Sequence, residues 1–134
     1  MRAAICAFAV ASLLMFVGCS SEPTRVNVKG KVTLDGKSIQ NGVVEFVPVD
    51  GKTPTGKGGI ITDGQYTADL VPGDVLVKIR SSKVVGKRKR YDTPDSPLDD
   101  VTEEAIPKKY NEATTLKEKI TADRREINFD LKSQ

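Results

Sequence analysis

The sequence predicts an all-β domain of sandwich or barrel type behind a short apolar leader. Apolar and polar residues alternate with a period of two through several short runs, as in strands with one buried face. Asp-Gly and Pro-Gly pairs separate these runs and are typical of tight turns between strands. No apolar pattern of period 3.6 extends over the length of a helix. We therefore expect six or seven short strands around one core.

The first strand is expected at residues 26–34, where every second residue from Val26 to Leu34 belongs to one apolar face, Gly30 included. Asp35-Gly36 follows at once and favours a hairpin, because both residues accept positive φ. The remaining strands are expected where β-branched or alternating runs meet further turns, at residues 42–47, 59–62, 65–70, 75–80 and 127–131.

Length and composition restrict the function. The chain of 134 residues has room for one domain at about residues 26–134, and its net charge of +3 is too small for a nucleic-acid footprint. It contains no histidine, which excludes Ser-His-Asp hydrolysis and His-ligated zinc. We expect no cofactor and no enzymatic activity.

Residues 1–18 have the form of a secretory signal peptide. One positive charge, Arg2, precedes an apolar run of fifteen residues, which is short for a membrane span of about 20. Phe16-Val17-Gly18-Cys19 resembles the lipobox of bacterial lipoproteins, although Phe16 stands where Leu is usual. The resemblance implies cleavage between Gly18 and Cys19 and acylation of the Cys19 thiol. A plain signal without a lipid is the alternative.

Cleavage would leave Cys19 as the one cysteine of the mature chain, since Cys6 lies within the leader, so no internal disulfide is expected. Residues 19–25 are polar and contain Pro23, and we expect a tether between lipid and domain. More than one acyl chain anchors a protein stably, so the membrane is the expected partner. Ser20 lacks the Asp-type signal for inner-membrane retention, which favours the outer membrane, at its periplasmic or exterior face.

Residues 81–119 do not follow the strand rhythm, and we expect a long loop there. Its basic cluster is Lys87, Arg88, Lys89 and Arg90, and an acidic stretch follows at residues 92–104. One interpretation is a solvated excursion whose two halves attract each other weakly. The other is a contact for anionic lipid headgroups, lipopolysaccharide or cell-wall polymer. The segment 106–111 is expected to pin the loop to the sandwich edge through Ile106 and Tyr110, with a ligand-binding role as the alternative.

Carboxylates in the same region leave two further hypotheses open. A calcium site would use hard oxygen ligands from Asp92, Asp95, Asp99 and Asp100. A glycan-acting enzyme would need two acids across a cleft, and its candidates are Asp99, Asp100, Glu103 and Glu104. The spacing of the first set matches no calcium-binding loop, so no metal ligand is assigned. The acids of the second set lie in a charged loop and not in a concave apolar setting.

Motifs along the chain resemble a known family. Residues 28–39 resemble the opening strand and hairpin of carboxypeptidase regulatory-like domains, and residues 42–48, 62–66 and 71–77 resemble their next strands and turns. The resemblance implies a seven-stranded transthyretin-like, or prealbumin-like, β-sandwich. Over residues 16–131 the chain also resembles small bacterial lipoproteins in which an Ile-Pro-x-Lys-Tyr-Asn segment, here residues 106–111, precedes the last strands.

These resemblances imply a lipid-anchored, non-enzymatic protein of the cell envelope. Related domains act as structural or adhesive modules, so we expect an envelope protein or a glycan as the partner.

Overall fold

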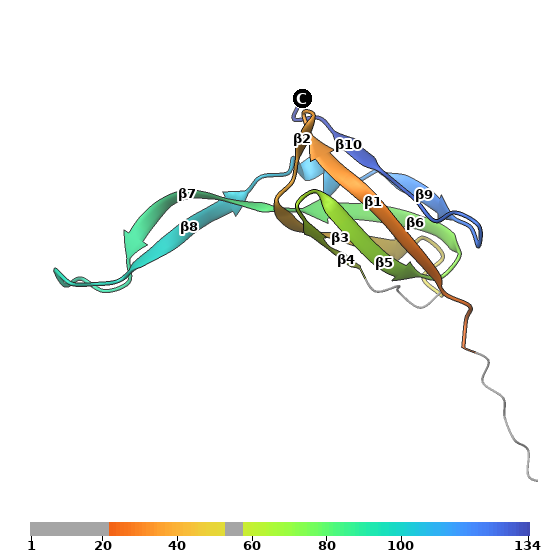
Figure 1. Ribbon diagram of the computed structural model, residues 1–134, viewed down its shortest axis with the longest axis horizontal. Helices are drawn as coiled ribbons and strands as arrows, with labels where there is room; N and C mark the ends of the chain where they lie inside the picture. The colour runs from red at the N-terminus through yellow and green to blue at the C-terminus, as the bar shows by residue number, and fades with distance from the viewer. Residues whose placement is uncertain (1–21, 53–57) are drawn as a thin grey trace, which may run out of the picture.

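The computed structural model describes residues 22–52 and 58–134. Predictions on the signal peptide, on cleavage at Gly18 and on acylation of Cys19 lie outside these residues. The described chain is all-β, with ten strands and one 3₁₀ turn (Figure 1). The strands are β1 (Val26–Leu34), β2 (Lys37–Ser38), β3 (Asn41–Pro48), β4 (Gly59–Thr62), β5 (Gln65–Leu70), β6 (Gly73–Arg80), β7 (Ser82–Lys89), β8 (Leu98–Glu104), β9 (Lys117–Ile120) and β10 (Phe129–Leu131), and the 3₁₀ turn η1 is Lys108–Tyr110.

Eight strands form one curled sheet, the body of the molecule. Its order is β10-β1-β5-β4-β3-β6-β9, with β2 paired to β1. All neighbours are antiparallel except β1 and β10, which run parallel. The sheet bends so that its two halves face each other across one core (Figure 1). The predicted all-β, sandwich-like fold is confirmed.

The predicted strands form because alternate side chains enter the core. Along β1, residues Val26, Val28, Gly30 and Val32 are buried while the residues between them are exposed. Tight turns follow at the predicted places: Asp35-Gly36 has φ values of 50° and 78°, and Asp63-Gly64 has 51° and 76°. Positive φ at both central positions matches the twist of a hairpin.

Three aromatic rings occupy the centre of the core. The ring centroids of Phe46, Tyr66 and Phe129 lie 6.0 to 6.3 Å apart. The Tyr66 hydroxyl donates a 2.8 Å hydrogen bond to the carbonyl oxygen of Ile127. Burial raises the pKa of this hydroxyl far above its usual value, and the charge of Glu118 adds to the rise. Tyr66 therefore stays protonated and remains a donor.

The C-terminal segment closes the sheet along the free edge of β1. The Lys29 amide donates to the carbonyl of Arg125, and the Ile127 amide donates to the carbonyl of Lys29, each at 3.0 Å. Further along, the Thr33 hydroxyl donates to Asp130 at 2.8 Å and lowers the pKa of that carboxyl. These bonds fix the register of the last strand against the first.

The prediction of a long loop at about residues 81–119 is wrong, because this region contains β7, β8, η1 and β9. β7 and β8 pair with each other and have solvent on both faces, so their sequence carries no alternation of buried and exposed residues. β9 pairs with β6, and of its four residues only Ile120 is buried. Its single apolar position gave too little signal.

The predicted pinning role of residues 106–111 is confirmed. Ile106 is 3% exposed and belongs to the core. The Asn111 side chain is buried and donates through Nδ2 to the carbonyl of Ile106 at 3.2 Å. The Tyr110 hydroxyl accepts a 3.0 Å hydrogen bond from the Lys132 amide. The segment joins β8 to the core and to the C-terminus.

We predict that Gly30→Ala destabilises the fold strongly. A Cβ at this position would lie 1.7 Å from the carbonyl oxygen of Ile127 and 2.9 Å from the Tyr66 ring. The C-terminal segment would have to move away from β1 to make room for the Cβ. The free energy of unfolding should therefore fall by about 2 kcal/mol or more.

Urea unfolding followed by circular dichroism measures this change. Gly86→Ala is the matched control, since its Cβ would meet nothing within 4 Å, and it should alter the free energy by less than about 0.5 kcal/mol. Equal stability of the two variants would contradict the close approach at Gly30.

Candidate binding surfaces: the β7–β8 arm and the β1–β5 groove

The first candidate surface is the hairpin of residues 82–104, here called the arm, which projects from the body (Figure 1). All eight residues of β7 are exposed, as are six of the seven in β8. Within the described chain, each of the two strands pairs only with the other. The arm therefore offers two faces and two outer strand edges to solvent.

One carboxylate holds the root of the arm. Oε1 of Glu104 accepts hydrogen bonds from the amide of Ser81 at 2.9 Å and from the amide of Ile106 at 3.0 Å. The Ala105 amide donates to the carbonyl of Ser81 at 2.7 Å, and the Ser81 hydroxyl donates to the carbonyl of Asn41 on β3. Glu104, a candidate acid for a glycan-acting enzyme, thus joins the arm to the body.

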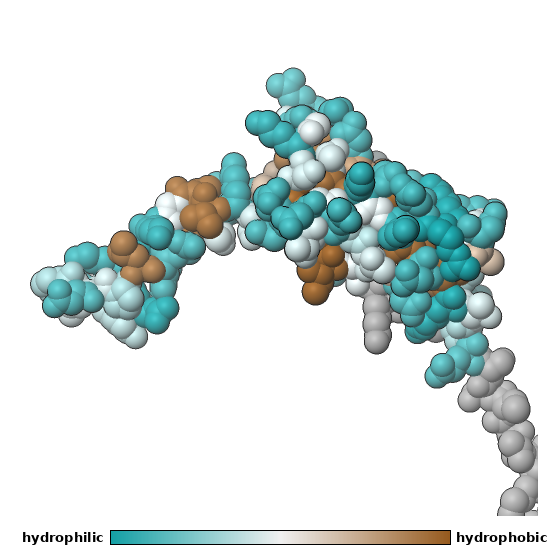
Figure 2. All heavy atoms as spheres, viewed as in Figure 1, coloured by the Kyte–Doolittle hydropathy of each residue, from teal (hydrophilic) through white to brown (hydrophobic). Residues whose placement is uncertain are grey.

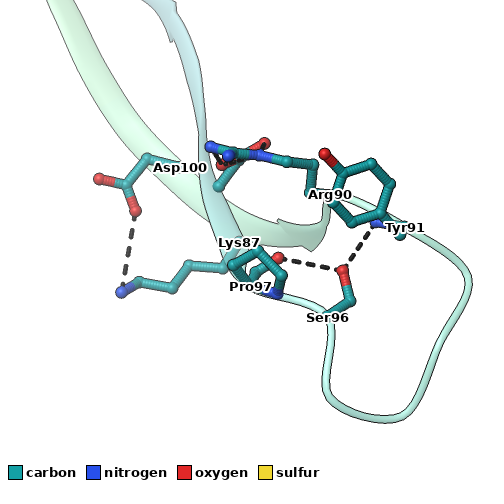
Figure 3. Close-up of polar contacts among 7 residues, drawn as sticks. Lys87, Arg90, Tyr91, Ser96, Pro97 and Asp100 are labelled. Atoms are coloured by element: carbon teal, nitrogen blue, oxygen red, sulfur yellow. Dashed lines mark hydrogen bonds and ion pairs between the residues drawn. The ribbon is translucent and has the colours of Figure 1, made fainter.

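The strand register places the basic cluster opposite acidic residues. Lys87 lies across from Asp100 and Arg88 across from Asp99. The Lys87 Nζ is 3.8 Å from Oδ1 of Asp100 (Figure 3). Arg90 binds Asp99 through two nitrogens, with Nη2 at 2.6 Å and Nε at 3.1 Å from its oxygens. The two halves of the region do attract each other, as one interpretation of the sequence expected.

These pairs change the electrostatic character of the predicted basic cluster. The hydrogen bonds that Arg90 donates to the Asp99 carboxylate raise the pKa of Arg90, so the guanidinium stays charged and occupied. Lys89 Nζ donates to the carbonyl of Thr93 at 3.3 Å. The arm contains five basic and six acidic residues, so it is not a cationic surface as a whole. An anionic membrane or polymer that approached the arm would find its positive charges balanced by neighbouring carboxylates.

The calcium hypothesis gains no support from the arrangement of its four aspartates. Asp99 and Asp100 form ion pairs with Arg90 and Lys87, and a calcium ion would have to displace these partners. In the described ranges no group of three or more His, Cys, Asp or Glu side chains is placed to hold a metal ion.

Hydrogen bonds also close the tip of the arm. The Tyr91 amide donates to Oγ of Ser96 at 2.7 Å, and Ser96 Oγ donates in turn to the carbonyl of Pro97 at 3.3 Å (Figure 3). The Arg90 amide donates to the carbonyl of Pro97 at 2.9 Å. These hydrogen bonds within the arm therefore give the tip a defined shape.

Large apolar side chains lie exposed along the arm. Figure 2 shows hydrophobic patches on it between hydrophilic stretches. A β-bulge separates Val84 from Gly86. The exposed apolar and aromatic residues, between 36% and 61% accessible, are Val84, Val85, Tyr91, Leu98 and Val101. A stretch of this kind is typical of a surface that meets another molecule.

The second candidate surface, here called the β1–β5 groove, lies on the outer face of β1, β5 and β4. It has a volume of about 700 Å³, within the range of ligand sites. The sequence gave no sign of it, because its side chains are the ordinary outward residues of three strands. The side chains that line it include Lys29, Lys31, Ile60, Thr62, Gln65 and Thr67.

In the part of the chain that the structure describes, no helix has the length and apolar character to cross a bilayer.

We predict that Asp99→Asn loosens the arm and leaves the body intact. The variant loses the ion pair with Arg90, which at this exposure stabilises by about 0.5 to 1 kcal/mol. Amide hydrogen exchange of β7 and β8 should accelerate about two- to fivefold, with unchanged exchange in β1 and β5. Asp95→Asn, in the turn of the arm, is the matched control, and identical exchange in both variants would contradict the prediction.

Comparison with known proteins identifies no relative. No protein-family model matches the chain, and neither does any curated protein sequence. Among solved structures, a 9R-lipoxygenase from Cyanothece PCC8801 aligns with 84% of this chain at 16% identity and a TM-score of 0.38. The chain spans about 18% of the length of that protein. A similarity at this level says nothing of function.

Proposed function

We propose that this chain is a lipid-anchored, non-enzymatic module of the cell envelope that contacts a protein partner through its arm. The observation that carries the proposal is the exposure of the arm, a two-stranded ribbon without cover from the rest of the described chain. A lone two-stranded hairpin is marginally stable in water. A partner that adds a strand or covers an apolar face would stabilise it.

Strand addition suits the construction of this arm. Each outer edge presents backbone N–H and C=O groups to solvent, and an extended segment of a partner can pair with such an edge. The exposed Val84 and Leu98 side chains would add apolar contact. Charged residues on both strands discourage unspecific pairing and favour a partner with complementary charges.

The same residues support a role without catalysis. Of the four acids considered for a glycan-acting enzyme, Asp99 and Asp100 are ion-paired and Glu104 holds the root of the arm. The chain also lacks a histidine to serve as a base near neutral pH. These carboxylates thus have structural partners in place of a substrate cleft.

Anchoring through Cys19 rests on the lipobox-like residues 16–19, and placement at the outer membrane rests on Ser20. The described chain begins at Glu22, whose segment to Arg25 is exposed and leaves the body on the side away from the arm (Figure 1). An anchor at that end would leave the arm free to meet a partner.

We predict that Cys19→Ser abolishes lipid attachment. Cells fed an alkyne-labelled fatty acid should incorporate label into the wild-type chain and into Cys6→Ser, since Cys6 lies in the cleaved leader. The Cys19→Ser chain should carry no label and leave the membrane fraction. Label retained in Cys19→Ser would refute the anchor.

We also predict that the arm, and not the body, contacts a partner in cells. A photo-crosslinking residue in place of Val84 or Leu98 should give a discrete adduct of higher mass in intact cells. The same residue at Val49, a comparably exposed aliphatic position on the body, should give none. An absence of adducts from both arm positions would contradict the proposed contact.

A further inference from the structure

The β1–β5 groove brings three kinds of side chain together in parallel rows. Lys29 and Lys31 lie on β1, and the register places Thr67 opposite Lys29 and Gln65 opposite Lys31 on β5. The β4 row follows with Thr62, which is paired to Gln65, and with Ile60. Cationic, hydrogen-bonding and apolar groups thus succeed one another across strands about 4.8 Å apart.

The cationic row has free charge. Lys29 and Lys31 are exposed, and within the described residues neither lies within ion-pair distance of a carboxylate. Glu126 also lines the groove, and its Oε1 accepts a 2.9 Å hydrogen bond from Nδ2 of Asn128. Two ammonium groups against one carboxylate favour a ligand with negative charge.

The other two rows define the rest of the ligand. The hydroxyls of Thr62 and Thr67 and the side-chain amide of Gln65 can each donate and accept hydrogen bonds, which suits a ligand rich in hydroxyls. Ile60 on β4 is 73% exposed and offers an apolar surface against which the C–H face of a sugar ring can pack. The single aromatic residue in the lining, Tyr66, is buried, so the groove offers no ring for stacking.

Main chain borders the groove as well as side chains. Gly30 and Gly58 line it through their backbone, and a Cβ at either position would meet a main-chain carbonyl, that of Ile127 or of Val44. The volume of about 700 Å³ suffices for a small oligomer.

From these observations we infer that the β1–β5 groove binds an acidic saccharide, a sugar oligomer that carries carboxylates. Its carboxylates bind Lys29 and Lys31, and a C–H face of one ring lies against Ile60. Its hydroxyls bind the polar side chains of Thr62 on β4 and of Gln65 and Thr67 on β5. Charge-assisted hydrogen bonds dominate the recognition, so the affinity falls as salt is raised. The site is separate from the arm and does not rest on the proposed protein contact.

Titration calorimetry of the full chain in detergent tests the inference with tetragalacturonic acid as the probe. We expect the acid to bind. Its methyl ester should bind with an affinity at least about tenfold lower, because the ester lacks the charge. Tetraglutamate, with similar charge and no sugar hydroxyls, should be weaker by a similar factor. Absence of binding by the acid, or equal binding of the ester or of tetraglutamate, would overturn the inference.

A pair of variants locates the site. Lys29→Gln with Lys31→Gln should weaken binding of tetragalacturonic acid about tenfold or more. Lys117→Gln with Lys119→Gln is the matched control, because these exposed lysines have the same spacing on β9, at the other edge of the sheet. Equal weakening in both pairs, or none in the first, would refute a site in the groove.

The two proposals fail independently. The Lys29→Gln, Lys31→Gln chain should give the same crosslinks from Val84 and Leu98 as the wild type, since the arm is unchanged. Loss of saccharide binding with intact crosslinks is the expected result, whereas loss of both would show that the substitutions disturb the whole fold and would overturn the groove assignment.

Discussion

The rest of the body depends on the close approach of the C-terminal segment to Gly30. The carbonyl of Ile127 occupies the space where any other residue at position 30 would carry a side chain. The Tyr66 hydroxyl satisfies that carbonyl inside the core, where an unpaired acceptor would cost about 1 to 3 kcal/mol. Closure of the curled sheet, stacking of Tyr66 on Phe129 and the parallel register of β1 with β10 all follow from this contact.

The arm follows a different physical logic from the body. In the body, apolar side chains from both halves of the sheet share one core, and polar residues stay outside. The arm has no such core. Its conformation is held by ion pairs between the two strands, by the hydrogen bonds at its tip and by the hydrogen bonds that Glu104 accepts at its root. Surface ion pairs contribute little each, so the arm keeps a shape that a partner can still remodel.

Apart from the two-residue β2, which is exposed at both positions, the strands between Val26 and Arg80 could be predicted because each has one buried and one exposed face. Alternation and the Asp-Gly turns then agree on the same boundaries. The arm could not be predicted in this way, since a ribbon with two wet faces has no period of two. Its charges were visible in the sequence as a basic run and an acidic run, and only the strand register shows that they are partners.

The segment 106–111 and the β1–β5 groove show the same contrast between what the sequence could and could not predict. Ile106 and Tyr110 could be assigned a pinning role because apolar residues inside a polar stretch need a place to be buried. Lys29 and Lys31, in contrast, resemble any outward lysines along a strand. Their meaning depends on Thr67, Gln65 and Ile60, which are distant in sequence and meet them only through the order of β1, β5 and β4.

The root of the arm has a mechanical consequence. β7 continues from β6 through Ser81, and β8 ends at Glu104, two residues before the buried Ile106, so both strands of the arm lead directly into the core. A pull on the tip would load the two strands side by side along their length, and the hydrogen bonds between them would bear little of the force. The tension would pass to β6 and to Ile106, which makes the arm a tensile link between its tip and the sheet interior.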